Sequence, residues 1–309
     1  MKNLDVLIIG SGPAGNTTAI YTVRSGLSTA IITGSTLGGQ LTITTEVENY
    51  PGFPEPIYGG ELMNRFLKQS ENLGVEIIYD TVIDVDLSKK PFICKTENNE
   101  IISANNLVIA TGASTKWLGI KGEKEFLGYG VSACAVCDGG FFRKKVVAVI
   151  GGGESAGIEA LHLSELASKV YIIYRKDSFA RISKAITNKI FTKDNIEIIY
   201  NTEVLEIFGQ EQPKKITHIK LFNNKTNETS ELKLDGLFVA IGRKPETDLF
   251  KNSNLEIDES GYIITESDST RTNIKNVYAV GDVSNKKYKQ AATAVGYGCI
   301  AGLEIQEDL

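Results

Sequence analysis

Short apolar runs recur along the chain, and two of them open the same series of elements. Residues 5–9 (DVLII) and 145–150 (KVVAVI) are both predicted to be short buried strands. Each run passes through a glycine-rich turn into a predicted helix, and a second apolar strand closes the unit. The predicted helices cover 14–25 and 155–167, and the closing strands cover 29–33 and 169–174. The chain therefore contains two copies of a strand–helix–strand unit, which is typical of α/β proteins with parallel sheets.

The two copies also have matching ends. Apolar strands at 107–112 and 237–242 each finish in glycine, as the last strand of a domain would. A later apolar segment, 277–280, leads into Gly281–Asp282, so the first copy resumes near residue 245. The second copy is therefore predicted to be inserted into the first. The expected domains are residues 1–114 with 245–309 and residues 115–244, joined by segments near 114–117 and 243–247.

Both glycine-rich turns follow the G-x-G-x-x-G/A pattern of dinucleotide-binding folds. The first is Gly10-Ser11-Gly12-Pro13-Ala14-Gly15 and the second is Gly151-Gly152-Gly153-Glu154-Ser155-Ala156. Side chains at the glycine positions would keep a pyrophosphate away from the backbone, and the next helix offers free N–H groups to it. The simpler alternative is a pair of tight turns in an ordinary α/β protein. Two matches, each between a strand and a helix, favour two Rossmann-like nucleotide sites.

The ends of the two closing strands differ, and this difference bears on the ligands. Arg175 and Lys176 follow the second closing strand, and Arg181 comes shortly after. Cations there suit a ribose 2′-phosphate, whereas a carboxylate would suit a 2′-hydroxyl, so NADPH is favoured over NADH. The alternative is a solvated, charged surface. The first closing strand ends in Thr33-Gly34 without an acidic residue, and this pattern alone leaves its ligand open.

Four cysteines are present, and two of them form a Cys-x-x-Cys pair, Cys134 and Cys137, followed by Asp138. A thiolate in such a pair can attack a partner disulfide, and Asp138 is a candidate for moving protons on and off sulfur. A zinc site is disfavoured because there is no second Cys-x-x-Cys and the only histidines are His162 and His218. Cys94 and Cys299 are expected to be plain core residues.

Composition narrows the class without naming it. A chain of 309 residues is long enough for two domains, and its net charge of −5 argues against nucleic acid or an anionic membrane as the main partner. No apolar run approaches the roughly 20 residues that span a bilayer, and the N-terminal residues offer no signal-peptide core. A cytoplasmic protein is therefore expected.

From Leu4 to about Ile305 the chain resembles the low-molecular-weight thioredoxin reductases. Besides the first glycine turn and the Cys-x-x-Cys pair, the resemblance rests on short segments: 38–41 (GGQL), 46–52 (EVENYPG), 110–113 (ATGA), 130–132 (GVS), 281–283 (GDV) and 290–292 (QAA). It implies two Rossmann-like, three-layer ββα domains, the second inserted into the first. It also implies FAD in the first domain, NADPH in the second, thioredoxin as substrate, and a homodimer.

The resemblance assigns roles residue by residue. Cys137 would face the flavin and Cys134 would attack thioredoxin. The residues implied for FAD are Gly10, Gly12, Pro13, Ala14, Gly15, Thr33, Gly38, Gly39, Gln40, Leu41, Asn49, Ala110, Thr111, Gly112, Gly281, Asp282, Gln290, Ala291 and Ala292. Those implied for NADPH are Gly151, Gly153, Glu154, Ser155, Ala156, Arg175, Lys176 and Arg181. Hydride would pass from NADPH to FAD and two electrons on to the cysteine pair, with the inserted domain swinging between the two half-reactions.

The chain departs from the family pattern at several positions. Lys176 and Ala180 replace arginines, Glu154-Ser155 replaces Asn or Asp followed by Thr, and Gly140 precedes the aromatic pair Phe141-Phe142. These changes bear on the choice between NADPH and NADH and on the docking surface for the partner. An anion at Glu154 is expected close to the nicotinamide nucleotide.

Related classes fit less well. The glutathione reductase-like group carries its dithiol in the FAD domain and a catalytic histidine in a C-terminal domain, whereas no histidine follows His218 here. The flavoprotein subunit of alkyl hydroperoxide reductase has an additional N-terminal domain. Two further alternatives are a dithiol oxidase that uses oxygen without NADPH and a flavoprotein scaffold without chemistry. The second glycine turn with its cations weighs against the oxidase, and the intact cysteine pair weighs against the scaffold.

Overall fold

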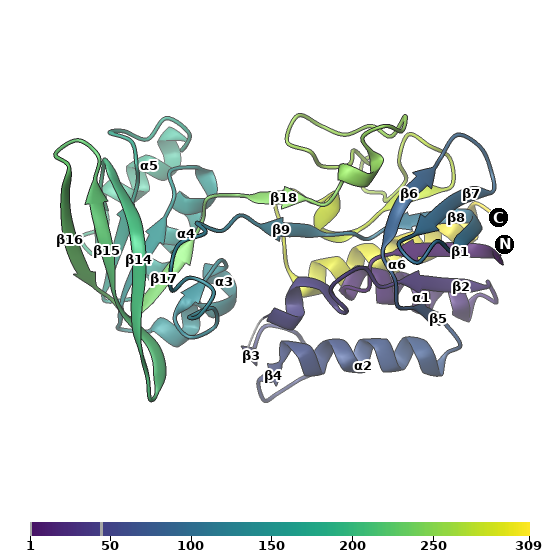
Figure 1. Ribbon diagram of the computed structural model, residues 1–309, viewed down its shortest axis with the longest axis horizontal. Helices are drawn as coiled ribbons and strands as arrows, with labels where there is room; N and C mark the ends of the chain where they lie inside the picture. The colour runs from purple at the N-terminus through teal and green to yellow at the C-terminus, as the bar shows by residue number, and fades with distance from the viewer. Residues whose placement is uncertain (1, 44–45) are drawn as a thin grey trace. The chain divides into compact units, whose positions relative to one another are not determined.

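The structure is a computed structural model that describes residues 2–43 and 46–309 (Figure 1). The chain divides into two compact units, which we call the discontinuous unit (residues up to Ser114, with Lys244–Leu309) and the inserted unit (Thr115–Arg243). The chain enters the inserted unit through β9 (Ala113–Thr115) and leaves it through β18 (Arg243–Pro245), and these two strands pair.

The discontinuous unit is built on a mixed seven-stranded sheet with the order β5-β2-β1-β8-β7-β6, in which β19 also pairs with β8. β8 is long enough to pair with β7 near its beginning and with β19 near its end. β1, β2, β5, β8 and β19 are parallel, and β6 and β7 form an antiparallel extension. The strands are β1 (Lys2–Ile9), β2 (Thr29–Ile32), β5 (Glu76–Ile78), β6 (Val82–Asp86), β7 (Phe92–Thr96), β8 (Ile101–Ile109) and β19 (Val277–Ala279).

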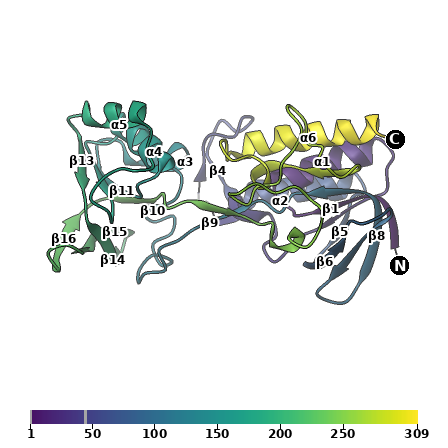
Figure 2. The same cartoon turned by 90° about the horizontal axis from the view of Figure 1, so that it is seen from above.

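Three helices pack in this unit, α1 (Pro13–Arg24), α2 (Gly59–Asn72) and α6 (Ala291–Glu307). α1 packs against both α2 and α6, and Figure 2 shows α6 running alongside α1. Two glycines of α6 make this approach possible. A Cβ atom on Gly298 would lie 2.4 Å from the carbonyl oxygen of Ala14, and one on Gly302 would lie 2.4 Å from Cβ of Tyr21. Close packing of α6 against α1 therefore requires glycine at positions 298 and 302.

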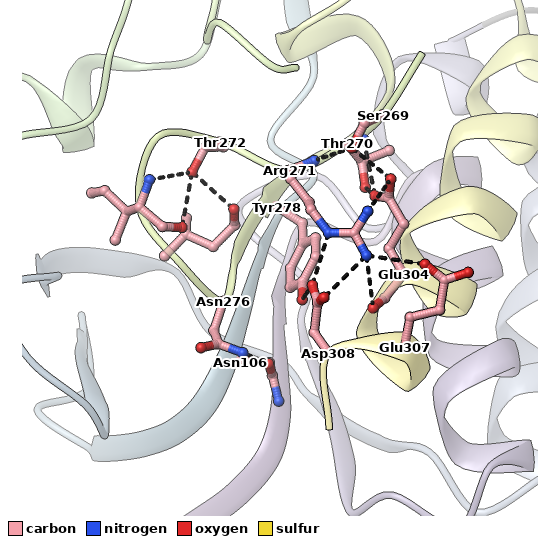
Figure 3. A network of polar contacts seen from close by, with 12 residues as sticks. Asn106, Ser269, Thr270, Arg271, Thr272, Asn276, Tyr278, Glu304, Glu307 and Asp308 are labelled. Carbon is pink, nitrogen blue, oxygen red and sulfur yellow. Dashed lines mark hydrogen bonds and ion pairs between the residues drawn. The ribbon is translucent and has the colours of Figure 1, made fainter. Parts of the chain in front are cut away.

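A polar network connects the end of α6 to the segment 269–271 and to Tyr278 of β19 (Figure 3). The carboxylate of Glu304 is almost fully buried and accepts hydrogen bonds from Ser269, from the hydroxyl of Thr270 and, at 3.0 Å, from the backbone of Thr270. Arg271 donates to Glu304 at 3.1 Å and also binds the last residues of the helix. The hydroxyl of Tyr278 donates to Asp308 at 2.7 Å.

The inserted unit has three layers. Its parallel sheet has the order β10-β17-β11-β12-β13 and packs one face against helices α4 and α5 and the other against the antiparallel sheet β14-β15-β16. The helices are α4 (Glu154–Ser164) and α5 (Lys184–Phe191). The strands are β10 (Val131–Ser132), β11 (Val146–Ile150), β12 (Lys169–Ile173), β13 (Ile196–Ile199), β14 (Thr202–Glu211), β15 (Lys214–Asn223), β16 (Glu228–Lys233) and β17 (Gly236–Val239). The predicted α/β architecture with two strand–helix–strand units is therefore confirmed.

Short elements complete the chain. They are η1 (Gly39–Ile43), β3 (Glu46–Val47), β4 (Ile57–Tyr58), α3 (Ala135–Asp138), η2 (Gly139–Phe142), η3 (Asp248–Phe250) and η4 (Gly281–Val283). Within the described residues, no helix combines the length and the apolar character needed to cross a membrane.

Candidate redox site and nucleotide-binding turns

The first glycine turn joins β1 to α1, and its three glycines have different reasons to be glycine. Gly10 has φ +117°, and a Cβ there would lie 2.3 Å from the carbonyl oxygen of Ala110. A Cβ on Gly15 would lie 2.0 Å from the carbonyl oxygen of Gly10. A Cβ on Gly12 would meet nothing within 4 Å, so this glycine keeps open space in front of the helix N-terminus. Packing therefore explains Gly10 and Gly15, whereas no packing contact among the described residues requires glycine at position 12.

A buried polar network supports this turn from behind. Ser11 donates its hydroxyl to the carbonyl of Thr33 and accepts from the N–H of Gly38, both at 3.0 Å. The side chain of Asn16 donates to the carbonyl of Ser11 at 2.6 Å and accepts from the hydroxyl of Ser70 at 2.8 Å. The network brings Thr33 and Gly38 next to the glycine turn. Sequence reasoning did not single out Asn16 or Ser70, because a contact between residues 54 positions apart leaves no local pattern.

Other residues implied for FAD also gather at this end of the sheet. A Cβ on Gly39 would come within 3.7 Å of Cα of Gly12, and one on Gly281 within 3.1 Å of Cβ of Ala14. Asn49 donates to the side chain of Gln290 at 3.2 Å, and Gln290 caps the N-terminus of α6. β1, β8 and β19 are parallel, so the segments that follow them, which include 110–112 and Gly281–Asp282, leave the sheet at the same edge. Gln40 and Leu41 lie in η1, and Ala291 and Ala292 begin α6.

The second turn repeats the hydrogen bonds of the first. In the discontinuous unit Gly10 N–H donates to Ile32 and Ala110 N–H donates to Ile9, both at 2.9 Å. In the inserted unit Gly151 N–H donates to Ile173 at 3.1 Å, and Ala240 N–H donates to Ile150 at 2.8 Å. The parallel extends to packing. A Cβ on Gly151 would lie 2.4 Å from the carbonyl oxygen of Ala240, and a Cβ on Gly153 would meet nothing within 4 Å.

The three cations after β12 lie on an exposed loop whose base is aromatic. Arg175, Lys176 and Arg181 are all solvent-exposed, and none takes part in an ion pair within the described part of the chain. Tyr174, at the start of this loop, stacks on Phe179 further along it, with ring centroids 5.6 Å apart. A Cβ on Gly152 would lie 2.0 Å from the ring of Tyr174, so this middle glycine is required by packing.

Glu154 begins α4, and its carboxylate is already bound. It accepts the backbone N–H of Ser183 at 2.7 Å and the hydroxyl of Ser183 at 2.9 Å. Ser183 lies 29 residues further along the chain and directly precedes α5. The expected anion at the second glycine turn is therefore engaged by the start of another helix.

Cys134 and Cys137 form a disulfide at the beginning of the short helix α3, with their Cα atoms 5.3 Å apart. The N–H of Cys137 donates to Sγ of Cys134 at 3.2 Å. Ser132 donates its hydroxyl to Asp138 at 2.5 Å and accepts the N–H of Cys134 at 3.1 Å. Burial raises the pKa of the Asp138 carboxyl, and the hydrogen bond from Ser132 offsets part of that rise. A carboxyl with a raised pKa, directly after Cys137 in the chain, is suited to proton transfer.

The other two cysteines belong to the discontinuous unit. Cys94 is fully buried in the core of the discontinuous unit, and burial together with nearby Asp84 raises the pKa of its thiol to about 12. Such a thiol stays protonated and unreactive near neutral pH. Cys299 is a free, half-buried cysteine on α6.

Two glycine turns of dinucleotide-binding type, with a disulfide and a half-buried acid in the unit of the second, define the class as a nucleotide-dependent disulfide oxidoreductase. Comparison with known proteins agrees. The family model for pyridine nucleotide-disulphide oxidoreductases matches residues 4–298. A thioredoxin reductase of Rickettsia prowazekii is 49% identical over 304 residues, which cover 98% of this chain and 97% of that protein.

Solved structures lead to the same family. A thioredoxin reductase from Giardia duodenalis has a TM-score of 0.94 at 39% identity, covering 100% of this chain and 99% of that one. One from Streptococcus pyogenes has a TM-score of 0.93 at 39% identity, covering 99% and 98%. The chain belongs to the pyridine nucleotide-disulphide oxidoreductases, and within them to the low-molecular-weight thioredoxin reductases.

Proposed function

We propose that the chain is an NADPH-dependent thioredoxin-disulfide reductase that uses FAD. The observation that carries the proposal is the Cys134–Cys137 disulfide with Asp138 beside it, in the unit that also holds the second glycine turn. The names of the similar proteins support thioredoxin as the substrate. Family resemblance also supports a homodimer, and the cytoplasm stays the expected location from the sequence.

The discontinuous unit has features that fit FAD. Gly12 leaves open space before α1, and the N-terminus of α1 has no side-chain cap, so its N–H groups can meet a pyrophosphate. The 38–41 segment, Asn49, Asp282 and the start of α6 would hold the rest of the cofactor. A flavin bound there supplies two-electron redox chemistry that amino-acid side chains do not provide.

The inserted unit has features that fit NADPH. Gly153 leaves open space before α4, whose N-terminus also lacks a side-chain cap. Arg175, Lys176 and Arg181 supply positive charge for a 2′-phosphate. Because this turn and the disulfide share one unit, we propose that the inserted unit rotates on β9 and β18 to serve the two half-reactions in turn.

The protein's own groups account for the transfer to thioredoxin. In the reduced pair, Cys134 gives up its proton and its thiolate attacks one sulfur of the thioredoxin disulfide, while the other thioredoxin sulfur leaves and takes up a proton. Cys137 then gives up its proton and attacks Sγ of Cys134, and the second thioredoxin sulfur leaves and takes up a proton. This restores the Cys134–Cys137 disulfide and releases dithiol thioredoxin, so that two electrons and two protons are transferred. Asp138 directly follows Cys137, and the raised pKa of its carboxyl supports a role in moving protons to and from the pair.

The test compares wild type with Cys137→Ser under anaerobic conditions. NADPH should bleach the flavin of both proteins, whereas only wild type should reduce thioredoxin. Thioredoxin reduction by Cys137→Ser would contradict the relay. A dithiol oxidase would instead leave the flavin oxidised on NADPH addition and, in a separate aerobic assay, consume oxygen with small dithiols. A colourless protein that takes up no added flavin would overturn the proposal as a whole.

A further inference from the structure

Glu154 lies where the N-termini of two helices meet. It is the first residue of α4, and both of its carboxylate oxygens bind Ser183, which directly precedes α5. Ser183 makes no side-chain cap to its own helix, because its hydroxyl is turned to Glu154. We call this pair of hydrogen bonds the Glu154–Ser183 clasp. Negative charge is stabilised at helix N-termini, so the carboxylate suits this place.

The clasp closes the loop that carries the cations. The loop begins after β12, where the carbonyls of Arg175 and Lys176 accept hydrogen bonds from Asn224 at 2.9 Å and Asn201 at 3.0 Å. It ends at the clasp, and just before the clasp the backbone of Arg181 pairs with that of Gly153. The loop is thus held at its beginning by contacts to its backbone carbonyls and at its end by Glu154.

We propose that Glu154 is a positioning residue for nucleotide specificity. Through Ser183 it keeps Arg181 beside Gly153, so that the cationic loop faces a ligand on the second glycine turn and distinguishes a 2′-phosphate from a 2′-hydroxyl. This inference rests on the proposed use of NADPH. Glu154 would act on the nucleotide indirectly, because its side chain binds Ser183 and so positions the cationic loop.

The opposite role for Glu154 makes a different prediction. A carboxylate that simply faced the nucleotide would repel the pyrophosphate of NADPH and NADH alike, because both carry it. Its removal would then strengthen the binding of both. In the structure the carboxylate is occupied by two donors, which favours the positioning role. The two roles are separated by comparing the two nucleotides rather than by activity alone.

The experiment measures binding of NADP⁺ and NAD⁺ to the oxidised, FAD-loaded protein by isothermal titration calorimetry. Glu154→Ala removes both hydrogen bonds, and Ser183→Ala removes only the one from the hydroxyl while the carboxylate stays. Ser178→Ala is the matched control, since this serine lies in the same loop and binds Asp177 instead. Circular dichroism and bound-flavin absorbance show that each variant is folded.

We expect Glu154→Ala to weaken NADP⁺ binding about tenfold and Ser183→Ala about threefold, because one exposed hydrogen bond of ordinary strength contributes about a factor of three and Glu154→Ala removes two. In both variants NAD⁺ binding should change less than about twofold. Ser178→Ala should change the binding of neither NADP⁺ nor NAD⁺. An unchanged or increased preference for NADP⁺ in Glu154→Ala would overturn the inference while leaving the proposed function standing. Wild type that binds neither nucleotide would overturn both, and wild type that binds the two equally would overturn the inference.

Discussion

The hydroxyl of Ser132 donates to the carboxylate of Asp138 across the segment that carries the disulfide-bonded cysteines. The same hydroxyl accepts the N–H of Cys134 at 3.1 Å. Ser132 therefore connects the acid to the backbone of a redox-active cysteine. Because a hydrogen bond to a carboxylate stabilises its charged form, Ser132 opposes the rise that burial causes in the pKa of Asp138.

Asp138→Asn should slow thioredoxin reduction by about 100-fold, which is the usual range for loss of a general acid or base. Reduction of the flavin by NADPH should persist, because that half-reaction does not use this proton. Stopped-flow absorbance and steady-state thioredoxin reduction separate the two steps. Equal slowing of both would place Asp138 outside the dithiol chemistry.

Ser132→Ala should move the pH profile of thioredoxin reduction. Without the donor, the pKa of Asp138 rises further above its ordinary value, so the carboxyl stays protonated to a higher pH. The alkaline limb due to loss of that proton should therefore shift to higher pH. A limb that shifts to lower pH would show that Asp138 is not the group being titrated.

The first turn predicts opposite outcomes for two glycine-to-alanine changes. Gly12→Ala puts a methyl group into open space, so the flavin-free protein should keep its stability to within about 1 kcal/mol and lose flavin affinity. Gly10→Ala puts its methyl group 2.3 Å from a carbonyl oxygen, and the residue must also adopt a positive φ. This variant should therefore lose about 3 kcal/mol or more of unfolding free energy. Urea unfolding and flavin titration measure the two effects. Full flavin binding by Gly12→Ala would mean that no phosphate approaches this turn.

Glu304 should be a large contributor to the stability of the discontinuous unit. Glu304→Ala leaves the donors of Thr270 and Arg271 without their buried acceptor, at a cost of about 3 kcal/mol in unfolding free energy. Glu307 binds the same arginine from an exposed position (Figure 3), so Glu307→Ala should cost less than about 1 kcal/mol. Denaturant unfolding of both variants checks the difference. Similar losses of unfolding free energy in the two variants would show that the burial of Glu304 does not increase its contribution to stability.

Motifs with a local spacing were predictable from the sequence, and contacts between distant side chains were not. The two glycine turns, the closing strands and the cysteine pair all lie within short segments whose pattern reflects the fold. The sequence also placed an anion at Glu154, but it did not indicate the bond to Ser183, which depends on how α4 and α5 pack. The same holds for Asn16 and Ser70, because each residue alone is an ordinary polar position of a helix.

The helix boundaries show the same contrast between local sequence signals, which were predictable, and contacts with distant residues, which were not. The helices expected at 14–25 and 155–167 are α1 (Pro13–Arg24) and α4 (Glu154–Ser164), so both starts were predicted to within one residue. The start is marked by the glycine turn. The end of α4 comes three residues early, where Asn195 donates to the carbonyls of Ser164 and Ala167. That contact comes from a segment some 30 residues later, and periodicity carries no sign of it.

Glu159 predicts an unusual dependence of stability on pH. It lies on α4, and its Oε2 is buried without a hydrogen-bond partner among the described residues. Burial raises the pKa of its carboxyl to about 7, and Arg243 partly opposes this. A pKa raised by folding means that the folded state holds the proton more tightly. Glu159 therefore does not reduce the free energy of unfolding below its ordinary pKa near 4.5. It reduces that free energy as pH rises through about 7.

Glu159→Gln removes this titration while keeping the shape of the side chain. The variant should be more stable than wild type by on the order of 2 kcal/mol at pH 8, and about equal to it near pH 4.5. The matched control is Glu165→Gln at the end of the same helix. An ion pair with Lys193 lowers the pKa of the Glu165 carboxyl, so this variant should be less stable than wild type at pH 8. Urea unfolding at both pH values measures the difference. A Glu159→Gln variant that is less stable than wild type at pH 8 would mean that the ionised carboxylate is held by Arg243 more strongly than burial disfavours it.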